Sequence, residues 1–180
     1  MTDGDFSTLC QSAFAAVINR HHMKVASSRS DRDVWQWTLV NTTTGVRVTY
    51  ELRGAYLGVQ IGQLVDGHFP RSVGEIGPET TLTYFDLLNL VALRGEMPHD
   101  YSLRSRLPHP DAVRDTLVKL ANALDFYAAD VLEGDFAVFA RLELIVKERA
   151  RQAAYQKWGG KAREFGVDGS IDLPAEGLVQ

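Results

Sequence analysis

The sequence predicts an α+β domain in which a helix comes first, an antiparallel meander of three to four strands follows, and helices end the chain. Two observations predict this class. Apolar and polar residues alternate between 34 and 61, which is typical of half-buried strands joined by short turns. Between 110 and 158 apolar residues instead recur every three or four positions, which is typical of long amphipathic helices.

The first expected element is a helix from Phe6 to His22, because its apolar residues share one face at three- and four-residue spacing. Cys10 lies on that face and is the single cysteine of the chain, so no internal disulfide can form. We expect its thiol to behave as a small buried hydrophobe. A chain without disulfides also favours a reducing compartment.

The strands are expected next. Trp35 and Trp37 share one strand face and are expected to pack in the core. Residues Asn41–Gly45 have the length of a hairpin connection. The strands themselves are expected over 23–26, 34–41, 46–53 and 57–61.

Helices are expected after the strands. Residues 84–93 predict a short helix that is apolar on most sides and therefore buried. Pro110–Trp158 predicts a long αα-hairpin packed on one sheet face, with Gly134 ending its first helix and Asp135 capping its second. We expect one domain over 1–165 and a mobile acidic tail over 166–180.

Composition limits the function classes. The chain has 180 residues, 45% of them hydrophobic and 23% charged, with a net charge of -4. A general nucleic-acid binder usually carries a basic excess, so none is expected here. The first residues lack a basic and then apolar signal pattern, and no apolar stretch reaches membrane-spanning length. We therefore expect a cytoplasmic protein.

Acidic residues around Gly134 are the candidate partner site. Three carboxylates within six residues could hold a hard cation, but the glycine and the alternating acids of a calcium loop are absent, so no metal is predicted. The first helical arm is rich in acids and the second in bases. The two arms could pair with each other, or the acidic arm could meet a basic partner protein. The predicted partner-binding residues are Asp125, Asp130, Glu133 and Asp135.

Histidines supply the alternative site. Adjacent His21 and His22 do not have a metal-binding spacing. His99 and His109 lie in a proline-containing loop, where Asp100 or Asp111 could complete an acid–base pair. No nucleophile motif, glycine-rich phosphate loop or dinucleotide fingerprint occurs, so no cofactor is expected.

The run from Tyr127 to Phe136, followed by Phe139 and Leu142, resembles a segment of small bacterial α+β proteins. Some of those proteins resemble immunity proteins, which neutralise partner toxins. The resemblance covers Leu117–Arg149 and carries over no catalytic or binding residue. The acidic composition and the lack of a metal-ligand set and of a nucleophile motif favour a non-enzymatic interaction domain that binds a partner protein, and the resemblance implies one of immunity type. A small enzyme using the loop histidines and an oligomerising structural subunit are the alternatives.

Overall fold

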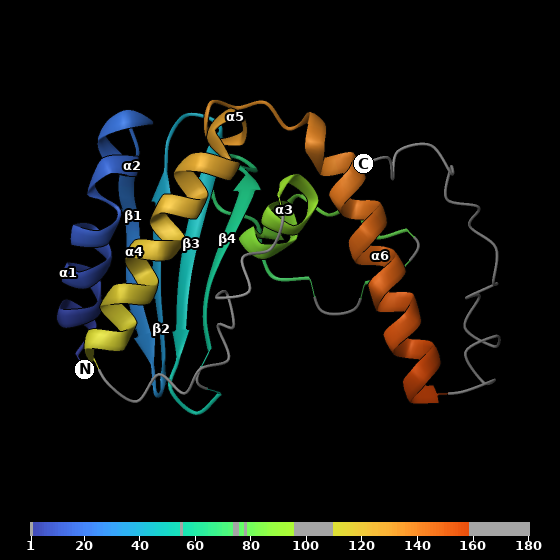
Figure 1. The fold of residues 1–180 in the computed structure, drawn as a ribbon, viewed down its shortest axis with the longest axis horizontal. Helices are drawn as coiled ribbons and strands as arrows, with labels where there is room; N and C mark the ends of the chain where they lie inside the picture. Colours follow the sequence, from blue (N-terminus) through green and yellow to red (C-terminus); the bar gives the residue numbers. More distant parts are fainter. Residues whose placement is uncertain (1, 55, 74–75, 78, 96–109, 159–180) are drawn as a thin grey trace.

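The computed structural model of the protein describes residues 2–54, 56–73, 76–77, 79–95 and 110–158 (Figure 1). These residues form an α+β fold, which confirms the predicted class. The elements, in chain order, are α1 Asp3–Ala13, α2 Ala15–Arg20, β1 Lys24–Asp31, β2 Val34–Val40, β3 Thr44–Glu51, β4 Tyr56–Gln63, β5 Tyr84–Asp86, α3 Leu87–Arg94, α4 Pro110–Tyr127, α5 Ala129–Leu132 and α6 Ala137–Trp158.

The strands form one antiparallel sheet in the order β1-β2-β3-β4-β5. The predicted meander is confirmed, but it has five strands rather than three to four. β1 continues past Ala26 to Asp31, because the polar residues there still pair with β2. β5 takes the start of the predicted helix over 84–93 and pairs with β4. α3 then begins where the Asp86 carboxylate accepts a hydrogen bond from the backbone N–H of Leu88 at 2.8 Å.

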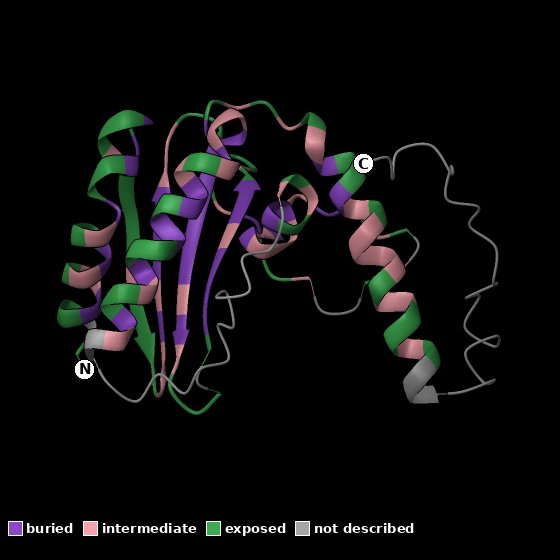
Figure 2. Ribbon diagram, in the orientation of Figure 1, coloured by how far each residue is buried: buried purple, intermediate pink, exposed green. Residues whose placement is uncertain are grey.

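One face of the sheet carries the core, and α1 and α4 pack against it (Figures 1 and 2). Trp35 and Trp37 are buried on this face, as expected. Phe14 meets Trp37 edge-on with ring centroids 5.8 Å apart, and Phe6 of α1 stacks on Tyr50 at 6.1 Å. These aromatic contacts attach the N-terminal helices to β2 and β3.

The predicted helix over 6–22 is present as two helices, α1 and α2, which meet at Phe14. It begins earlier than predicted because Thr2 and Asp5 form a capping box. The Thr2 hydroxyl accepts from the backbone N–H of Asp5 at 3.2 Å, and the Asp5 carboxylate accepts from the N–H of Thr2 at 2.8 Å. Cys10 is fully buried, which confirms its expected place on the apolar face.

The C-terminal helices differ in arrangement from the predicted hairpin over 110–158. α4 packs against α1, α3 and β4, whereas α6 packs against α3 and β5 and extends away from the sheet (Figure 1). The short helix α5 lies between them, with Val131 and Leu132 buried in the core. The two long helices are therefore joined through the short helix α5 and not by one tight turn. The predicted packing of a single long hairpin on one sheet face is not confirmed.

The local turn signals between α4 and α6 are confirmed in part. Gly134 has a φ of +95°, a left-handed conformation that a residue with a side chain rarely adopts. The Asp135 carboxylate accepts a hydrogen bond from the backbone N–H of Ala137 at 2.9 Å and so caps α6. The predicted cap of the second helix is thus confirmed, whereas the predicted end of the first helix at Gly134 is wrong, because α4 ends at Tyr127 and Gly134 follows the separate helix α5.

No helix in the described part of the chain has both the length and the apolar composition of a membrane span. The tail expected over 166–180 lies outside the described residues.

Candidate functional site

The four acidic residues predicted to bind a partner lie between the end of α4 and the start of α6. They have different surroundings rather than forming one acidic cluster. Two of the four form ion pairs with arginines from other helices, and a third caps α6. The side chain of the fourth forms no ion pair and accepts no hydrogen bond from any described residue. The four are Asp125, Asp130, Asp135 and Glu133, of which Glu133 is the unpaired one.

Asp130 is held by Arg94 from the end of α3. Both guanidinium Nη atoms donate to the carboxylate, at 2.5 and 2.6 Å, and Nη1 also donates to the backbone oxygen of Tyr127 at 2.7 Å. These hydrogen bonds raise the pKa of Arg94 and lower the pKa of Asp130. The pair links α3 to the junction between α4 and α5.

Asp125 is held from the other side, by the end of α2. Its carboxylate accepts a hydrogen bond from Arg20 and lies 3.0 Å from Nε2 of His21. The His21 side chain is only 3% exposed, whereas that of Arg20 is 63% exposed. The contact places a histidine–carboxylate pair at the edge of the molecule and joins α2 to α4.

Phe126 lies between these two ion pairs in the sequence, and it is the most exposed large hydrophobic residue in the described part of the chain, at 78%. Its ring meets the Tyr127 ring edge-on, with centroids 4.8 Å apart and planes at 83°. Tyr127 is in turn bonded through its backbone oxygen to Arg94. We call Phe126, together with Arg20, Arg94, Asp125, Asp130 and Glu133, the Phe126 surface.

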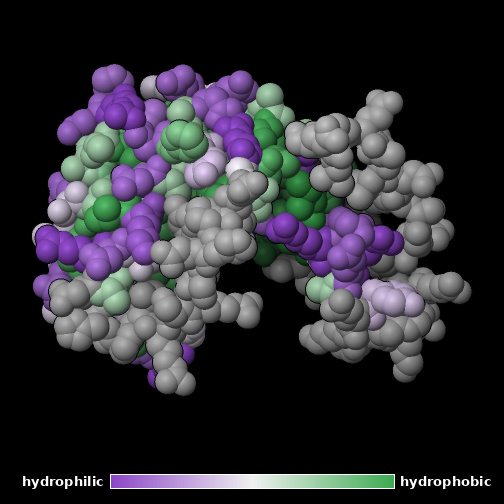
Figure 3. All heavy atoms as spheres, viewed as in Figure 1, coloured by the Kyte–Doolittle hydropathy of each residue, from purple (hydrophilic) through white to green (hydrophobic). Residues whose placement is uncertain are grey.

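A cleft of about 680 Å³ adjoins the Phe126 surface, between the end of α2, the β2–β3 turn and α5. Arg20, His22 and Lys24 contribute to one side of its lining, and Glu133 contributes from α5. Hydrophilic side chains gather over this end of the molecule (Figure 3). The cleft is therefore lined by charges of both signs and continues from the Phe126 surface through two shared residues, Arg20 and Glu133.

The floor of the cleft is fixed by side chains of the β2–β3 turn. The Asn41 amide donates to the backbone oxygens of Leu132 at 2.8 Å and of His21 at 3.4 Å. The Thr44 hydroxyl is buried and donates to the backbone oxygen of Val131 at 2.7 Å. These hydrogen bonds connect the turn to the end of α2 and to α5, the two helices that line the cleft.

The alternative site predicted from His99, His109 and Asp100 lies outside the described residues. Within the described ranges, no three histidine, cysteine or acidic side chains are arranged to hold a metal ion. Comparisons of the chain with protein-family models, with curated proteins and with solved structures find no match.

Sequence reasoning missed Phe126, Arg20 and Arg94. The arginines were not identifiable, because each pairs with an acid far along the chain, 105 and 36 residues away. Phe126 did leave a signal. Phe126 falls outside the three- and four-residue spacing of the buried residues on α4, such as Leu120 and Leu124. A helix that buries those residues therefore exposes Phe126.

Proposed function

We propose that this protein is a non-enzymatic, cytoplasmic interaction domain of bacterial immunity type, and that it binds a partner protein through the Phe126 surface and the adjoining cleft. The observation that carries the proposal is the 78% exposure of Phe126, which lies in the sequence between Asp125 and Asp130, the two acids that pair with arginines. Single exposed apolar residues are common on proteins and need no explanation by themselves. Phe126 differs from such residues in the groups that surround it.

The surroundings of Phe126 match the composition of protein–protein interfaces. Aromatic residues and arginine are enriched in such interfaces, and a few of them supply most of the binding energy. Phe126 offers an apolar ring, and Arg20 and Arg94 offer guanidinium groups on either side of its helix. Covering the Phe126 ring with a partner would remove the apolar group of this surface that is most exposed to water.

The charged groups beside Phe126 are already held in place. Arg94 is bound by Asp130 and by the backbone of Tyr127, and Arg20 is bound by Asp125. Ordering a long side chain on binding costs about 0.5–1.5 kcal/mol, and this cost is reduced when the side chain is already ordered. The ion pairs thus favour binding because they order the two arginine side chains before the partner arrives, which lowers the cost of ordering them on binding.

The charge of the Phe126 surface indicates the character of the partner. Its carboxylates, from Asp125, Asp130 and Glu133, outnumber its guanidinium groups. The Glu133 carboxylate is exposed and unpaired with respect to the described residues. A partner that brings a basic side chain to Glu133 would be attracted and oriented by this excess negative charge.

An affinity capture experiment tests the proposal. The full chain, immobilised, is exposed to a native lysate of its source organism, and captured proteins are quantified against the bait. The expected result is one partner protein captured in stoichiometric amount by the wild type and lost with Phe126→Ala, because truncating a central interface aromatic typically costs about 2 kcal/mol or more, which corresponds to at least a tenfold loss of affinity.

The matched control is Tyr155→Ala on α6, which also removes an exposed helical aromatic, here 61% exposed. Tyr155→Ala should capture the same partner as the wild type. Circular dichroism and a thermal melt establish that both variants are folded. Capture of no stoichiometric partner by the wild type, or equal capture by Phe126→Ala, would overturn the proposal.

A further inference from the structure

Arg47 is a buried cation that has no acidic partner among the residues that the structure describes. It lies on β3, on the face of the sheet opposite the core, and the residue is only 9% exposed. Its one hydrogen bond to a described residue runs from Nη2 to the backbone oxygen of Pro70, at 3.3 Å, and its guanidinium carbon lies 4.0 Å from the centre of the Phe69 ring. The Nε atom is buried and makes no hydrogen bond.

This environment is unfavourable for a charged group. Transfer of an ion out of water is costly unless the ion is paired and hydrogen-bonded, and a stacked aromatic ring offsets only part of the cost. Arg29 of β1 carries a charge of the same sign and adds to this cost, whereas Tyr84 acts in the opposite direction. Burial, and after it this like charge, lower the pKa of Arg47. An anion bound beside Arg47 would offset this cost.

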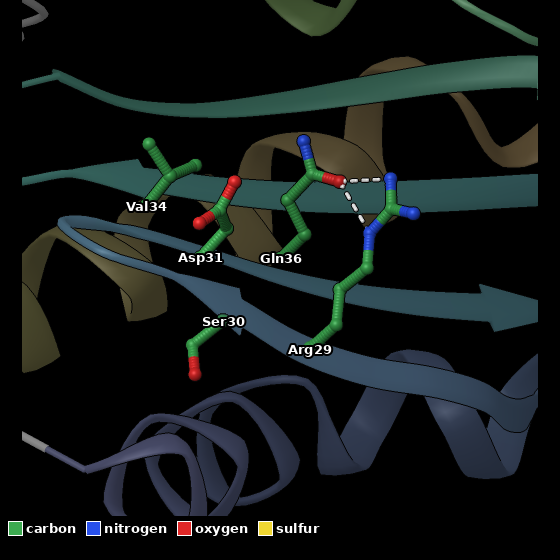
Figure 4. Close-up of a pocket in the computed structure, with 5 residues that line it drawn as sticks. All are labelled: Arg29, Ser30, Asp31, Val34 and Gln36. Carbon is green, nitrogen blue, oxygen red and sulfur yellow. Dashed lines mark hydrogen bonds between the residues drawn. The ribbon is translucent and has the colours of Figure 1, made fainter.

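The region around Arg29 and Arg47 has the form of a binding site for such an anion. The strand register places Arg29 of β1 opposite Gln36 of β2, and places Thr38, two residues further along β2, opposite Arg47 of β3, so both arginines lie on the same face of the sheet with β2 between them. Arg29 donates from Nε and Nη2 to Oε1 of Gln36, at 2.9 and 2.5 Å, and this pair lines a depression of about 380 Å³ (Figure 4). Thr38 adds a buried hydroxyl beside Arg47.

We propose that Arg47 and Arg29 form a binding site for a small oxyanion, a phosphate or carboxylate group, on the face of the sheet opposite α1 and α4. Guanidinium groups suit both anions because their N–H donors match two oxygens at once. Nη1 of Arg47, which makes no hydrogen bond in the described structure and is not sealed from solvent, is the donor available to the anion. The site is separate from the Phe126 surface and does not depend on its function.

The depression also contains one carboxylate, that of Asp31, which would repel an anion. Asp31 pairs with Val34 at the far end of the β1–β2 ladder, two residues beyond Arg29. Arg47 does not itself line the depression. The oxyanion is therefore expected at the Arg29 end, away from Asp31 and on the sheet face that also carries Arg47, where two cations outweigh the single acid.

Thermal unfolding of the full chain in different sodium salts tests the site. Sodium phosphate and sodium acetate, each compared with sodium chloride at equal ionic strength and pH, separate a tetrahedral oxyanion from a carboxylate and from general salt effects. Because a ligand that binds only the folded protein stabilises it, the midpoint temperature should rise in at least one of the two salts relative to chloride. Isothermal titration calorimetry with the same anion then measures its dissociation constant.

Three variants make the test specific. Arg47→Met keeps the length of the side chain and removes the charge, so it should abolish the rise in midpoint temperature. Arg29→Met, at an exposed residue, should weaken anion binding about tenfold or more, since a hydrogen bond to a charged group contributes about 1.5–3 kcal/mol. If Arg47→Met fails to fold, the Arg29→Met variant still tests the site. Arg53→Met removes an arginine that pairs with Asp33 instead, and should leave the rise unchanged.

The proposal is overturned if neither salt raises the wild-type midpoint above that in chloride. It is equally overturned if the rise is the same in the wild type, Arg29→Met and Arg53→Met, because the anion would then act on the whole surface rather than at this site.

Discussion

Both Nη atoms of the Arg94 guanidinium donate hydrogen bonds to the Asp130 carboxylate, at 2.5 and 2.6 Å, and this pair joins the end of α3 to the start of α5. A two-point contact of this kind is stronger and more directional than a single-point ion pair. The Arg94 side chain is 28% exposed and that of Asp130 is 40% exposed, so water weakens the attraction between them. The pair therefore orients the Phe126 surface more than it stabilises the fold.

The first prediction concerns the pH dependence of this pair. Asp130→Asn should lower the free energy of unfolding by about 1 kcal/mol at pH 7, as measured by urea denaturation. Arg94 lowers the pKa of Asp130 below its ordinary value of 3.8 in the folded protein. The stabilisation is therefore complete above pH 3.8 and is lost as the pH falls through the lowered folded value. A difference between the variant and the wild type that persists unchanged at pH 2 would contradict this account.

The second prediction concerns Gly134, which combines a φ of +95° with a close contact. A Cβ atom added there would lie 2.8 Å from the Thr43 hydroxyl oxygen. Gly134→Ala should therefore cost about 2 kcal/mol or more, from the left-handed backbone and the contact together. Gly67 provides the control, because its φ is +75° and nothing lies within 4 Å of its added Cβ. Gly67→Ala should cost only about 1 kcal/mol.

The contribution of Thr43 can be separated by a second substitution. In the Gly134→Ala background, Thr43→Ala removes the hydroxyl oxygen from the contact and should recover part of the lost stability, but not the part due to φ. Denaturation of the four proteins of this double-mutant cycle measures the coupling. Zero coupling would mean that the contact with the β2–β3 turn has no energetic weight.

The third prediction concerns Cys10, whose thiol is fully buried against the core. Burial raises its pKa well above the ordinary range, so the reactive thiolate is scarce in the folded protein. A thiol-specific reagent should label the native protein slowly, at the rate at which the structure opens, and should label it at once in denaturant. Cys10→Ala should show no labelling in either state. Equally fast labelling of native and denatured wild type would be inconsistent with the buried position.

Much of the fold follows from local patterns in the sequence. Alternation placed β2, β3 and β4, and the three- and four-residue spacing placed the N-terminal helices and the long C-terminal ones. The second half of β1 was missed because Ser27 and Asp31 lie on a polar, exposed edge strand, where no apolar face has to be buried. β5 was missed because Tyr84–Asp86 becomes a strand only by pairing with β4.

The arrangement of the C-terminal helices, and with it the candidate site, depends on contacts between distant residues. Thr44 and Asn41 donate hydrogen bonds to the backbone of α5, which lies between α4 and α6, from 87 and 91 residues away. Arg20 likewise reaches Asp125 across 105 residues. Local periodicity holds no information on such pairs, so the acids could be identified as a group of interest, but their arginine partners could not.

The central claim is that Phe126 lies at the centre of a surface that binds a partner protein. Site-specific photocrosslinking in living cells tests it most directly, with p-benzoylphenylalanine placed at position 126 in one protein and at position 155 in another, both exposed aromatic positions on helices. The account predicts a discrete crosslinked species of defined mass from position 126 and none from position 155. The absence of a crosslink at position 126, or the same crosslinked species from both positions, would contradict it.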